Sequence, residues 1–241
     1  MSSKPKVVIL CGGEGTRLRE ETENKPKPMV MIGGMPILWH IMKIYSHFGY
    51  NDFVLALGYK GDVIKQFFLQ QKDAKEWNIA FAETGLKAQT GARIKRIEKY
   101  VGGEDGFLAT YGDAVANVDI QKLVEFHKRQ NTTATLTAVH PHSKWGLVKA
   151  GEAGHIESFV EKPYLYDFVN GGFFAFKKDI FDYISDREDA VLEAEPFSKL
   201  VEKKQFSMYK HEGFWHSMDT YKDYLELNRI WDSGGAKWKV W

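Results

Sequence analysis

The chain has 241 residues, and its 33 basic and 32 acidic side chains give a formal net charge of +1. This balance produces no global field that would favour nucleic acid or an acidic membrane surface as a partner. A hydrophobic content of 44% and a charged content of 27% are ordinary for a globular protein that can bury a sizeable core. Cys11 is the single cysteine, which excludes an intrachain disulfide. The chain starts without an apolar signal segment and contains no bilayer-spanning run, so we expect a cytoplasmic protein.

Short apolar runs alternate with helical patterns through the first 140 residues. Strands are predicted at 7–10, 53–57, 77–82, 107–111 and 134–139. Helices are predicted at 36–48, 62–69, 90–101 and 119–130. This alternation is typical of an α/β fold, in which a mainly parallel sheet carries helices on both faces. Ligands of such sheets bind beyond the carboxyl ends of the strands.

The pattern changes near residue 140, after which short strands dominate. Strands are predicted at 146–149, 155–160, 169–176, 206–210 and 214–218, and helices at 178–185, 195–203 and 220–231. The chain contains no repeat, low-complexity segment or flexible linker. We therefore expect a single domain, 1–241, whose first part (1–140) is followed by a smaller β-rich part (141–241).

A glycine-rich segment follows the first strand, where residues 10–18 read Leu-Cys-Gly-Gly-Glu-Gly-Thr-Arg-Leu. Glycines let the backbone turn sharply and present its N–H groups at close range to phosphate oxygens. Thr16 and Arg17 add a hydroxyl and a cation, and Lys27 lies between two prolines that stiffen its segment. These features predict a nucleoside triphosphate site at the end of the first strand.

An ordinary turn remains an alternative for this segment, because glycine-rich turns often have no ligand. The segment also matches neither of two common nucleotide loops. The third glycine of the dinucleotide fingerprint is missing, and the chain has no Gly-Lys-Ser or Gly-Lys-Thr of a P-loop. A dinucleotide-dependent oxidoreductase is disfavoured for the same reason.

Two predicted strands end in a carboxylate, at Asp113 and at Asp219. Mg²⁺ is commonly held by one or two carboxylates together with substrate phosphates and water. The two aspartates are therefore candidate magnesium ligands. The alternatives are a simple loop aspartate at Asp113 and an N-cap of the following helix at Asp219.

Three further motifs are candidate binding groups. In the segment 161–163, Glu-Lys-Pro, Lys162 could neutralise a second phosphate, although Lys-Pro pairs are usually surface features. In the segment 170–172, Asn-Gly-Gly, Asn170 could bind hydroxyls; a strand bulge is the alternative. The segment 90–93, Thr-Gly-Ala-Arg, opens a predicted helix, whose N-terminus could bind an anion or a base edge or could simply be capped.

The ordered set of motifs resembles the sugar nucleotidyltransferases along nearly the whole chain, and within them the enzymes that use CTP and glucose 1-phosphate. The matching pieces are CGGEGTRL with KPKPM, IGGMPILWHIMKIYSHFG, GYKG, TGARIKRI, YGD, EKP, NGGFF and GFWHSMDT. The resemblance implies a Rossmann-like nucleotidyltransferase fold, a magnesium ion, a CTP donor, a sugar 1-phosphate acceptor and assembly into a homo-oligomer. It also implies a nucleotide-binding part at 1–140 and an acceptor-binding part at 141–241.

The resemblance further implies residue roles. Arg17 and Lys27 would hold the triphosphate, and Asp113 and Asp219 would bind the metal; these four are the expected catalytic residues. The expected nucleotide-binding residues are Leu10, Gly12, Gly13, Gly15, Thr16, Arg17, Lys27, Thr84, Thr90, Gly91, Arg93 and Gly112. The expected acceptor-binding residues are Glu161, Lys162, Asn170 and Gly171.

The resulting hypothesis is an enzyme that moves CMP from CTP to the phosphate of a small acceptor, with glucose 1-phosphate as the first candidate. Ala114, where the family has glycine, and the aromatic segment 164–168 keep another sugar 1-phosphate, or a non-sugar phosphate such as a phosphorylated amino acid, as alternatives. A non-catalytic sugar-nucleotide sensor is a further alternative, although the lysine and both aspartates are retained. Nucleic acid and membranes are not expected as partners.

Overall fold

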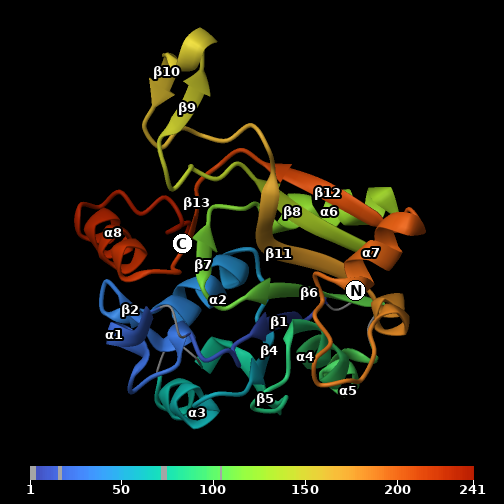
Figure 1. Ribbon diagram of the computed structural model, residues 1–241. Coiled ribbons are helices and arrows are strands. Elements are labelled where there is room, and N and C mark those ends of the chain that lie inside the picture. The colour runs from blue at the N-terminus through green and yellow to red at the C-terminus, as the bar shows by residue number, and fades with distance from the viewer. Residues whose placement is uncertain (1–3, 16–17, 72–74, 104) are drawn as a thin grey trace.

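A seven-stranded sheet runs through the computed structural model, which describes residues 4–241 except 16, 17, 72–74 and 104 (Figure 1). The strand order is β12-β8-β11-β6-β1-β4-β5. The strands are β1 (Val7–Leu10), β4 (Asp52–Leu57), β5 (Asn78–Glu83), β6 (Gly106–Tyr111), β8 (Ala134–Val139), β11 (Val169–Lys177) and β12 (Phe206–His211). β11 is antiparallel to β6 and β8, whereas the other pairings are parallel. This mixed, mostly parallel sheet confirms the predicted α/β fold class.

Two hydrophobic cores lie on the two faces of the sheet. The first contains residues of α2 (Ile37–His47), α3 (Gly61–Gln70), α6 (Ile120–Gln130) and α8 (Tyr221–Asp232). The second contains residues of α4 (Thr90–Arg96), α5 (Glu98–Val101), α7 (Glu195–Glu202) and the 3-10 helix η5 (Lys178–Tyr183). Side chains alternate along a strand, so Val7 and Ile9 enter the first core and Val8 the second. An uninterrupted apolar run is therefore what a strand covered on both sides requires.

Two of the predicted helices differ from the structure. The range predicted as a helix at 178–185 contains the 3-10 helix η5, and the helix predicted at 90–101 divides into α4 and α5 at Ile97. Ile180, Phe181 and Ile184 are all buried, and such an apolar pattern does not separate a 3-10 helix from an α-helix. None of the helices formed by the described residues has the length and apolar character needed to cross a bilayer.

Short elements complete the fold around the carboxyl ends of β1 and β6. They are α1 (Arg19–Thr22), the 3-10 helix η2 (Lys27–Met29), β2 (Met31–Ile32), β3 (Met35–Pro36), β7 (Ala114–Ala116) and β13 (Trp215–Ser217). The strands β2 and β3 form one small antiparallel ladder, and β7 and β13 form another. The sequence pattern predicted the region of β13 but not β7.

The two predicted parts of the domain share the main sheet. Strands β11 and β12, which follow residue 140, lie beside β6 and β8, which precede it. The functional division into 1–140 and 141–241 stays a prediction.

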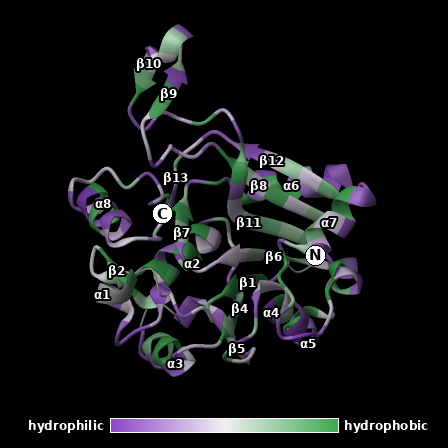
Figure 2. Cartoon of the chain, viewed as in Figure 1, coloured by the Kyte–Doolittle hydropathy of each residue, from purple (hydrophilic) through white to green (hydrophobic). Residues whose placement is uncertain are grey.

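A β-hairpin formed by β9 (Leu147–Ala150) and β10 (Ile156–Val160) projects from the body at the top of Figure 1. The 3-10 helix η4 (Glu152–Gly154) forms its tip. Every residue of the two strands is exposed, including Phe159 at 61% and Ile156 at 66%. Figure 2 shows hydrophobic residues on this projection as well as along the central strands. The hairpin thus has little support from the rest of the described chain.

Candidate active site

A cavity of about 850 Å³ opens at the carboxyl ends of β1 and β6. It lies where the α/β architecture places ligands. Its lining residues are Leu10, Cys11, Gly12, Gly13, Gly15, Lys27, Pro28, Ala88, Gln89, Thr90, Arg93, Tyr111, Gly112, Asp113, Ala114, Asn170, Gly171, Val191, Glu193, Trp215, Ser217 and Asp219. Most of the residues predicted to bind a nucleotide are therefore brought together around one space.

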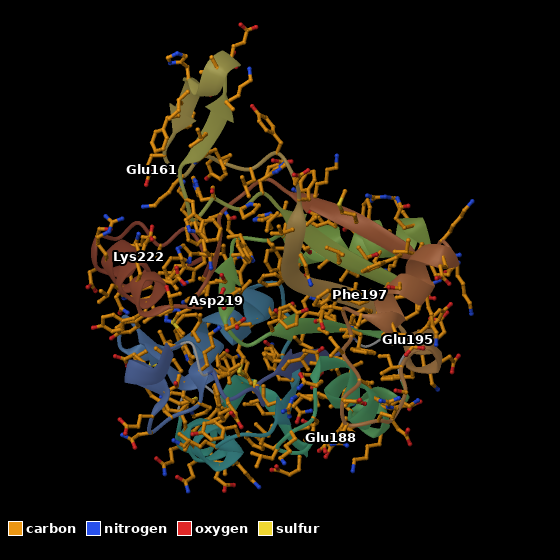
Figure 3. All side chains as sticks on the ribbon, in the orientation of Figure 1. Glu161, Glu188, Glu195, Phe197, Asp219 and Lys222 are labelled. Carbon is orange, nitrogen blue, oxygen red and sulfur yellow. The ribbon has the colours of Figure 1, made fainter. Side chains whose placement is uncertain are left out.

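Backbone pairing explains why Asp113 and Asp219 meet although 106 positions separate them in the chain. β7 directly follows Asp113, and β13 ends just before Met218 and Asp219. The antiparallel ladder of β7 and β13 is extended by a hydrogen bond in which the Met218 N–H donates to the Asp113 carbonyl at 2.8 Å. Both carboxylates then face the cavity (Figure 3 labels Asp219).

The Lys27 ammonium links the two carboxylates. Lys27 Nζ lies 2.7 Å from Asp113 Oδ2 and 2.9 Å from Asp219 Oδ1. Burial disfavours the charge on Lys27, but the two carboxylates outweigh this effect, so the pKa of Lys27 is raised. Burial likewise opposes the charge on Asp219, but Lys27 and the Ser217 hydroxyl, which donates at 2.8 Å, hold the pKa of Asp219 below its usual value. Lys27 and Asp219 are therefore both charged at neutral pH.

The N-cap interpretation of Asp219 is wrong. The cap of α8 is Thr220, whose hydroxyl accepts from the Asp223 N–H while the Asp223 carboxylate accepts from the Thr220 N–H. This reciprocal pair satisfies the start of the helix without the Asp219 carboxylate. The Asp219 carboxylate instead contacts Lys27 and lines the cavity.

The glycine segment follows β1 and lies against a buried arginine. The Arg93 side chain donates to the carbonyls of Gly12 (2.9 Å), Leu57 (3.0 Å) and Gly85 (2.9 Å) and to the Thr84 hydroxyl (2.7 Å). A Cβ at Gly12 would lie 2.0 Å from Arg93 Nη1, so only glycine fits there. Gly13 has open space at its Cβ position and Gly15 has a φ of +65°, which favours glycine. The arginine therefore holds the loop in shape from beneath.

Not every predicted nucleotide-binding residue reaches the cavity. Thr84 is buried under Arg93 and Gly91 packs against the Ala190 carbonyl, so neither lines the space. Burial lowers the pKa of Arg93, whose donors already have protein partners. Direct contacts of these residues with a nucleotide stay predictions, and the geometry favours positioning roles. Thr16 and Arg17 lie outside the described residues.

The predicted acceptor-binding residues fall into two groups. Asn170 and Gly171 on β11 line the cavity, and Asn170 Nδ2 donates to the Tyr111 hydroxyl at 3.1 Å. Glu161 and Lys162 do not line it; they follow β10 at the base of the hairpin, where Figure 3 labels Glu161. Their side chains pair with each other at 3.3 Å and are 58% and 46% exposed. Their acceptor role stays a prediction.

The sequence interpretation missed several lining residues, among them Glu193, Trp215 and Gln89. Glu193 accepts hydrogen bonds from the Thr90 hydroxyl at 2.6 Å and from the Tyr111 hydroxyl. The Trp215 indole N–H donates to the Gly171 carbonyl at 2.8 Å. Trp215 belongs to the GFWHSMDT motif, which could have suggested it, whereas the segment around Glu193 carries no motif of known chemistry.

Cys11 lies in the glycine segment, but its surroundings do not favour a reactive thiol. Its side chain is fully buried, and burial raises the pKa of the thiol far above its usual range. A thiol that does not ionise is a poor nucleophile. Cys11 thus fills space beneath the loop.

The site combines a glycine loop, a lysine and two aspartates at the strand ends of an open α/β sheet. This combination is typical of proteins that bind phosphorylated nucleotides. The model of the family described as nucleotidyl transferase matches residues 6–233, and the chain belongs to this family.

Relatives and solved structures agree with this membership. A probable glucose-1-phosphate cytidylyltransferase of Bacillus subtilis is 41% identical over 98% of this chain and 100% of its own length. The glucose-1-phosphate cytidylyltransferase of Salmonella typhi is 42% identical, with 98% of this chain and 99% of the relative covered. The crystal structure of HddC from Yersinia pseudotuberculosis complexed with GMP-PN has a TM-score of 0.75 at 24% identity, covering 95% of this chain and 100% of that one. The last similarity shows the fold alone.

Proposed function

We propose that this protein is a glucose-1-phosphate cytidylyltransferase, which transfers CMP from CTP to glucose 1-phosphate and releases pyrophosphate. The observation that carries the proposal is the cluster of Lys27, Asp113 and Asp219 beside the glycine loop. The choice of CTP and glucose 1-phosphate is supported by the two cytidylyltransferases that are 41% and 42% identical over nearly the full chain.

The reaction joins two anions. An oxygen of the acceptor phosphate attacks the α-phosphorus of CTP, the bond from this phosphorus to the bridging oxygen breaks, and pyrophosphate leaves with the bonding electron pair. The attacking oxygen is already anionic near neutral pH, so no general base is required. Catalysis then depends on bringing the groups together in line and on neutralising their charge. Lys27 and the backbone of the glycine loop are placed to do this at the triphosphate.

Asp113 and Asp219 fit a magnesium ion. Both carboxylates reach the single Lys27 ammonium, so both can reach one cation, and carboxylate oxygens are ligands that Mg²⁺ prefers. No cluster of three or more potential metal-ligating side chains occurs in the part of the chain that the structure describes, so phosphate and water would complete the coordination. When bound, Mg²⁺ would supply positive charge at the phosphate oxygens.

The acceptor end requires a movement if Lys162 is to serve the acceptor phosphate. Lys162 sits at the base of the exposed hairpin and does not line the cavity. The hairpin and its connections would close over the cavity when the acceptor binds, as substrate-induced closure of loops and lids does in other enzymes. Glu161 would move with it.

Pyrophosphate release from a panel of substrates tests the proposal. CTP, UTP, dTTP and GTP are each combined with glucose 1-phosphate, mannose 1-phosphate and phosphoserine in the presence of Mg²⁺. We expect turnover with CTP and glucose 1-phosphate to exceed that with every other pair. A preference for GTP and mannose 1-phosphate, as in the name of a 31% identical relative from Hypocrea jecorina, would contradict the proposal. Binding of CTP without turnover on any acceptor would support a sensor.

A further inference from the structure

One carboxylate in the cavity has no role in the proposed reaction. Among the described residues, three acidic ones line the space, and two of them, Asp113 and Asp219, form ion pairs with Lys27. The third, Glu193, comes from the segment between η5 and α7. Its neighbours are hydroxyls: the Thr90 hydroxyl donates to Oε2 and the Tyr111 hydroxyl to Oε1.

Charge limits what Glu193 can bind. An ionised carboxylate only accepts hydrogen bonds, and it repels phosphate groups. In a cavity that receives a triphosphate and a second phosphate, its partner must be an uncharged part of a substrate that donates hydrogen bonds. Sugar hydroxyls fit this requirement.

Glu193 lies outside the sheet, and the strand that it contacts favours the acceptor sugar as its partner. Its partner Tyr111 ends β6, and the Tyr111 hydroxyl also accepts from Asn170 on β11. β11 lies on the side of β6 opposite to β1, whereas the glycine loop follows β1. The chain of hydrogen bonds from Glu193 through Tyr111 to Asn170 therefore leads away from the triphosphate loop.

We propose that Glu193 binds a hydroxyl of the acceptor sugar and thereby selects sugar 1-phosphates over other phosphates. The inference rests on the proposed function. In the described conformation the Tyr111 hydroxyl holds the Oε1 atom; a sugar hydroxyl replaces or joins it when the acceptor binds. Burial and the nearby Glu193 carboxylate raise the pKa of Tyr111, so its hydroxyl keeps its proton and remains a donor. Thr90 fixes the other oxygen and so orients the carboxylate.

The test compares Glu193→Gln with the wild type on glucose 1-phosphate and on its 2-, 3-, 4- and 6-deoxy analogues, with CTP in excess. A hydrogen bond to a charged group is worth about 1.5–3 kcal/mol, so kcat/KM for glucose 1-phosphate should fall by about 10- to 100-fold. With one of the deoxy analogues the two proteins should become equal, because the missing hydroxyl is the one that Glu193 binds. The KM for CTP should stay unchanged.

Two further variants separate binding from a structural role. Glu188→Gln removes the same charge from an exposed position of the same segment (labelled in Figure 3) and should behave as wild type. Tyr111→Phe removes the hydroxyl that holds Glu193 and should preserve the discrimination among deoxy analogues. If Tyr111→Phe instead reproduces the loss seen in Glu193→Gln, Glu193 only braces the segment and the inference is wrong.

Other outcomes overturn the inference in distinguishable ways. An equal loss on all deoxy analogues, or a loss confined to CTP or to 2′-deoxy-CTP, would place Glu193 elsewhere in the reaction. An active wild type with an unchanged Glu193→Gln variant would defeat the inference alone. A wild type that releases no pyrophosphate from CTP and glucose 1-phosphate would defeat the proposed function as well.

Discussion

The glycine-loop end of the cavity and the hairpin differ in how completely the folded chain organises them. At the loop end, Lys27 is held by two carboxylates, and the buried Arg93 side chain connects the carbonyl of Gly12 in the glycine loop to the carbonyls of Leu57 and Gly85. On the hairpin, Glu161 and Lys162 are exposed and outside the cavity. The contrast shows that Lys27 and the two aspartates already face the cavity, whereas Glu161 and Lys162, two of the four residues predicted to bind the acceptor, do not.

The largest effect is expected at the preorganised end, from Asp219→Asn. Removing one of the two candidate magnesium ligands should lower turnover by about 100- to 1,000-fold, which is the size of effect known for loss of one oxyanion-hole donor. Pyrophosphate release measures turnover, and circular dichroism checks the fold. Lys222→Gln, at an exposed position on α8, is the control and should keep full activity. If Asp219→Asn turns over at the wild-type rate, Asp219 does not take part in catalysis.

Arg93→Met tests whether the loop is held from beneath. The change removes the buried guanidinium that donates to the carbonyls of Gly12, Leu57 and Gly85. The Tyr59 N–H still donates to Gly12 and Thr84 still donates to Leu57, whereas no other donor from the described residues reaches the Gly85 carbonyl. Because hydrogen bonds from a charged group are lost and one carbonyl is left unpaired, we expect a stability loss of about 3 kcal/mol. The KM for CTP should rise because the loop loses its support. Urea unfolding and steady-state kinetics measure both effects. Lys87→Met, at an exposed position nearby, should change neither. If the variant is destabilised but its KM for CTP is unchanged, support of the glycine loop by Arg93 is not needed for nucleotide binding.

Lys27→Met tests the charge balance of the same end through pH. The lowered pKa of Asp219 means that its contribution to stability is present above its unfolded pKa and is lost as pH falls through its folded pKa. Without Lys27 the two carboxylates repel each other at pH 7, and we expect a loss of about 2 kcal/mol. This loss should shrink toward pH 3, where protonation relieves the repulsion. Unfolding at both pH values measures it, with Lys25→Met, which loses a pair with Glu21, as the control. A loss that does not depend on pH would contradict the role of the carboxylates.

Lys162→Met tests whether the hairpin contributes to acceptor binding, and it should give the smallest effect of these variants. If the hairpin closes over the acceptor, the KM for glucose 1-phosphate should rise about tenfold, which corresponds to about 1.4 kcal/mol, while the KM for CTP stays the same. Lys149→Met on the same hairpin removes a surface ion pair with Glu157 and should be neutral. An equal rise in both KM values would argue against separate donor and acceptor ends.

The sequence was sufficient for the sheet and for the central charges, because both leave local signals. Continuous apolar runs identified β1, β4 and β6, and polar residues at strand ends identified Asp113 and Asp219. The sequence did not show which other residues each of these side chains contacts. The family resemblance places Arg93 among the expected nucleotide-binding residues, but the sequence does not show that its side chain lies under the glycine loop, because that location depends on contacts with β4 and Gly12.

Glu193 shows the opposite limit of sequence reasoning. Its neighbours Leu192 and Ala194 give no motif, and its importance comes from contacts with Thr90 and Tyr111, which lie 103 and 82 positions away. Such contacts follow from packing rather than from local pattern. The same holds for the hairpin: the sequence predicted short strands at 146–149 and 155–160, but not that the rest of the chain would leave β9 and β10 exposed.

The short ladder of β7 and β13 has a consequence for how this chain can change. Its three paired positions set the rotation of both aspartates, and side chains in a strand switch faces with every residue. A single inserted or deleted amino acid in either strand would turn one carboxylate away from its counterpart. Length variation should therefore be tolerated at the tip of the hairpin and rejected here, and a scan of one-residue insertions would map that boundary directly.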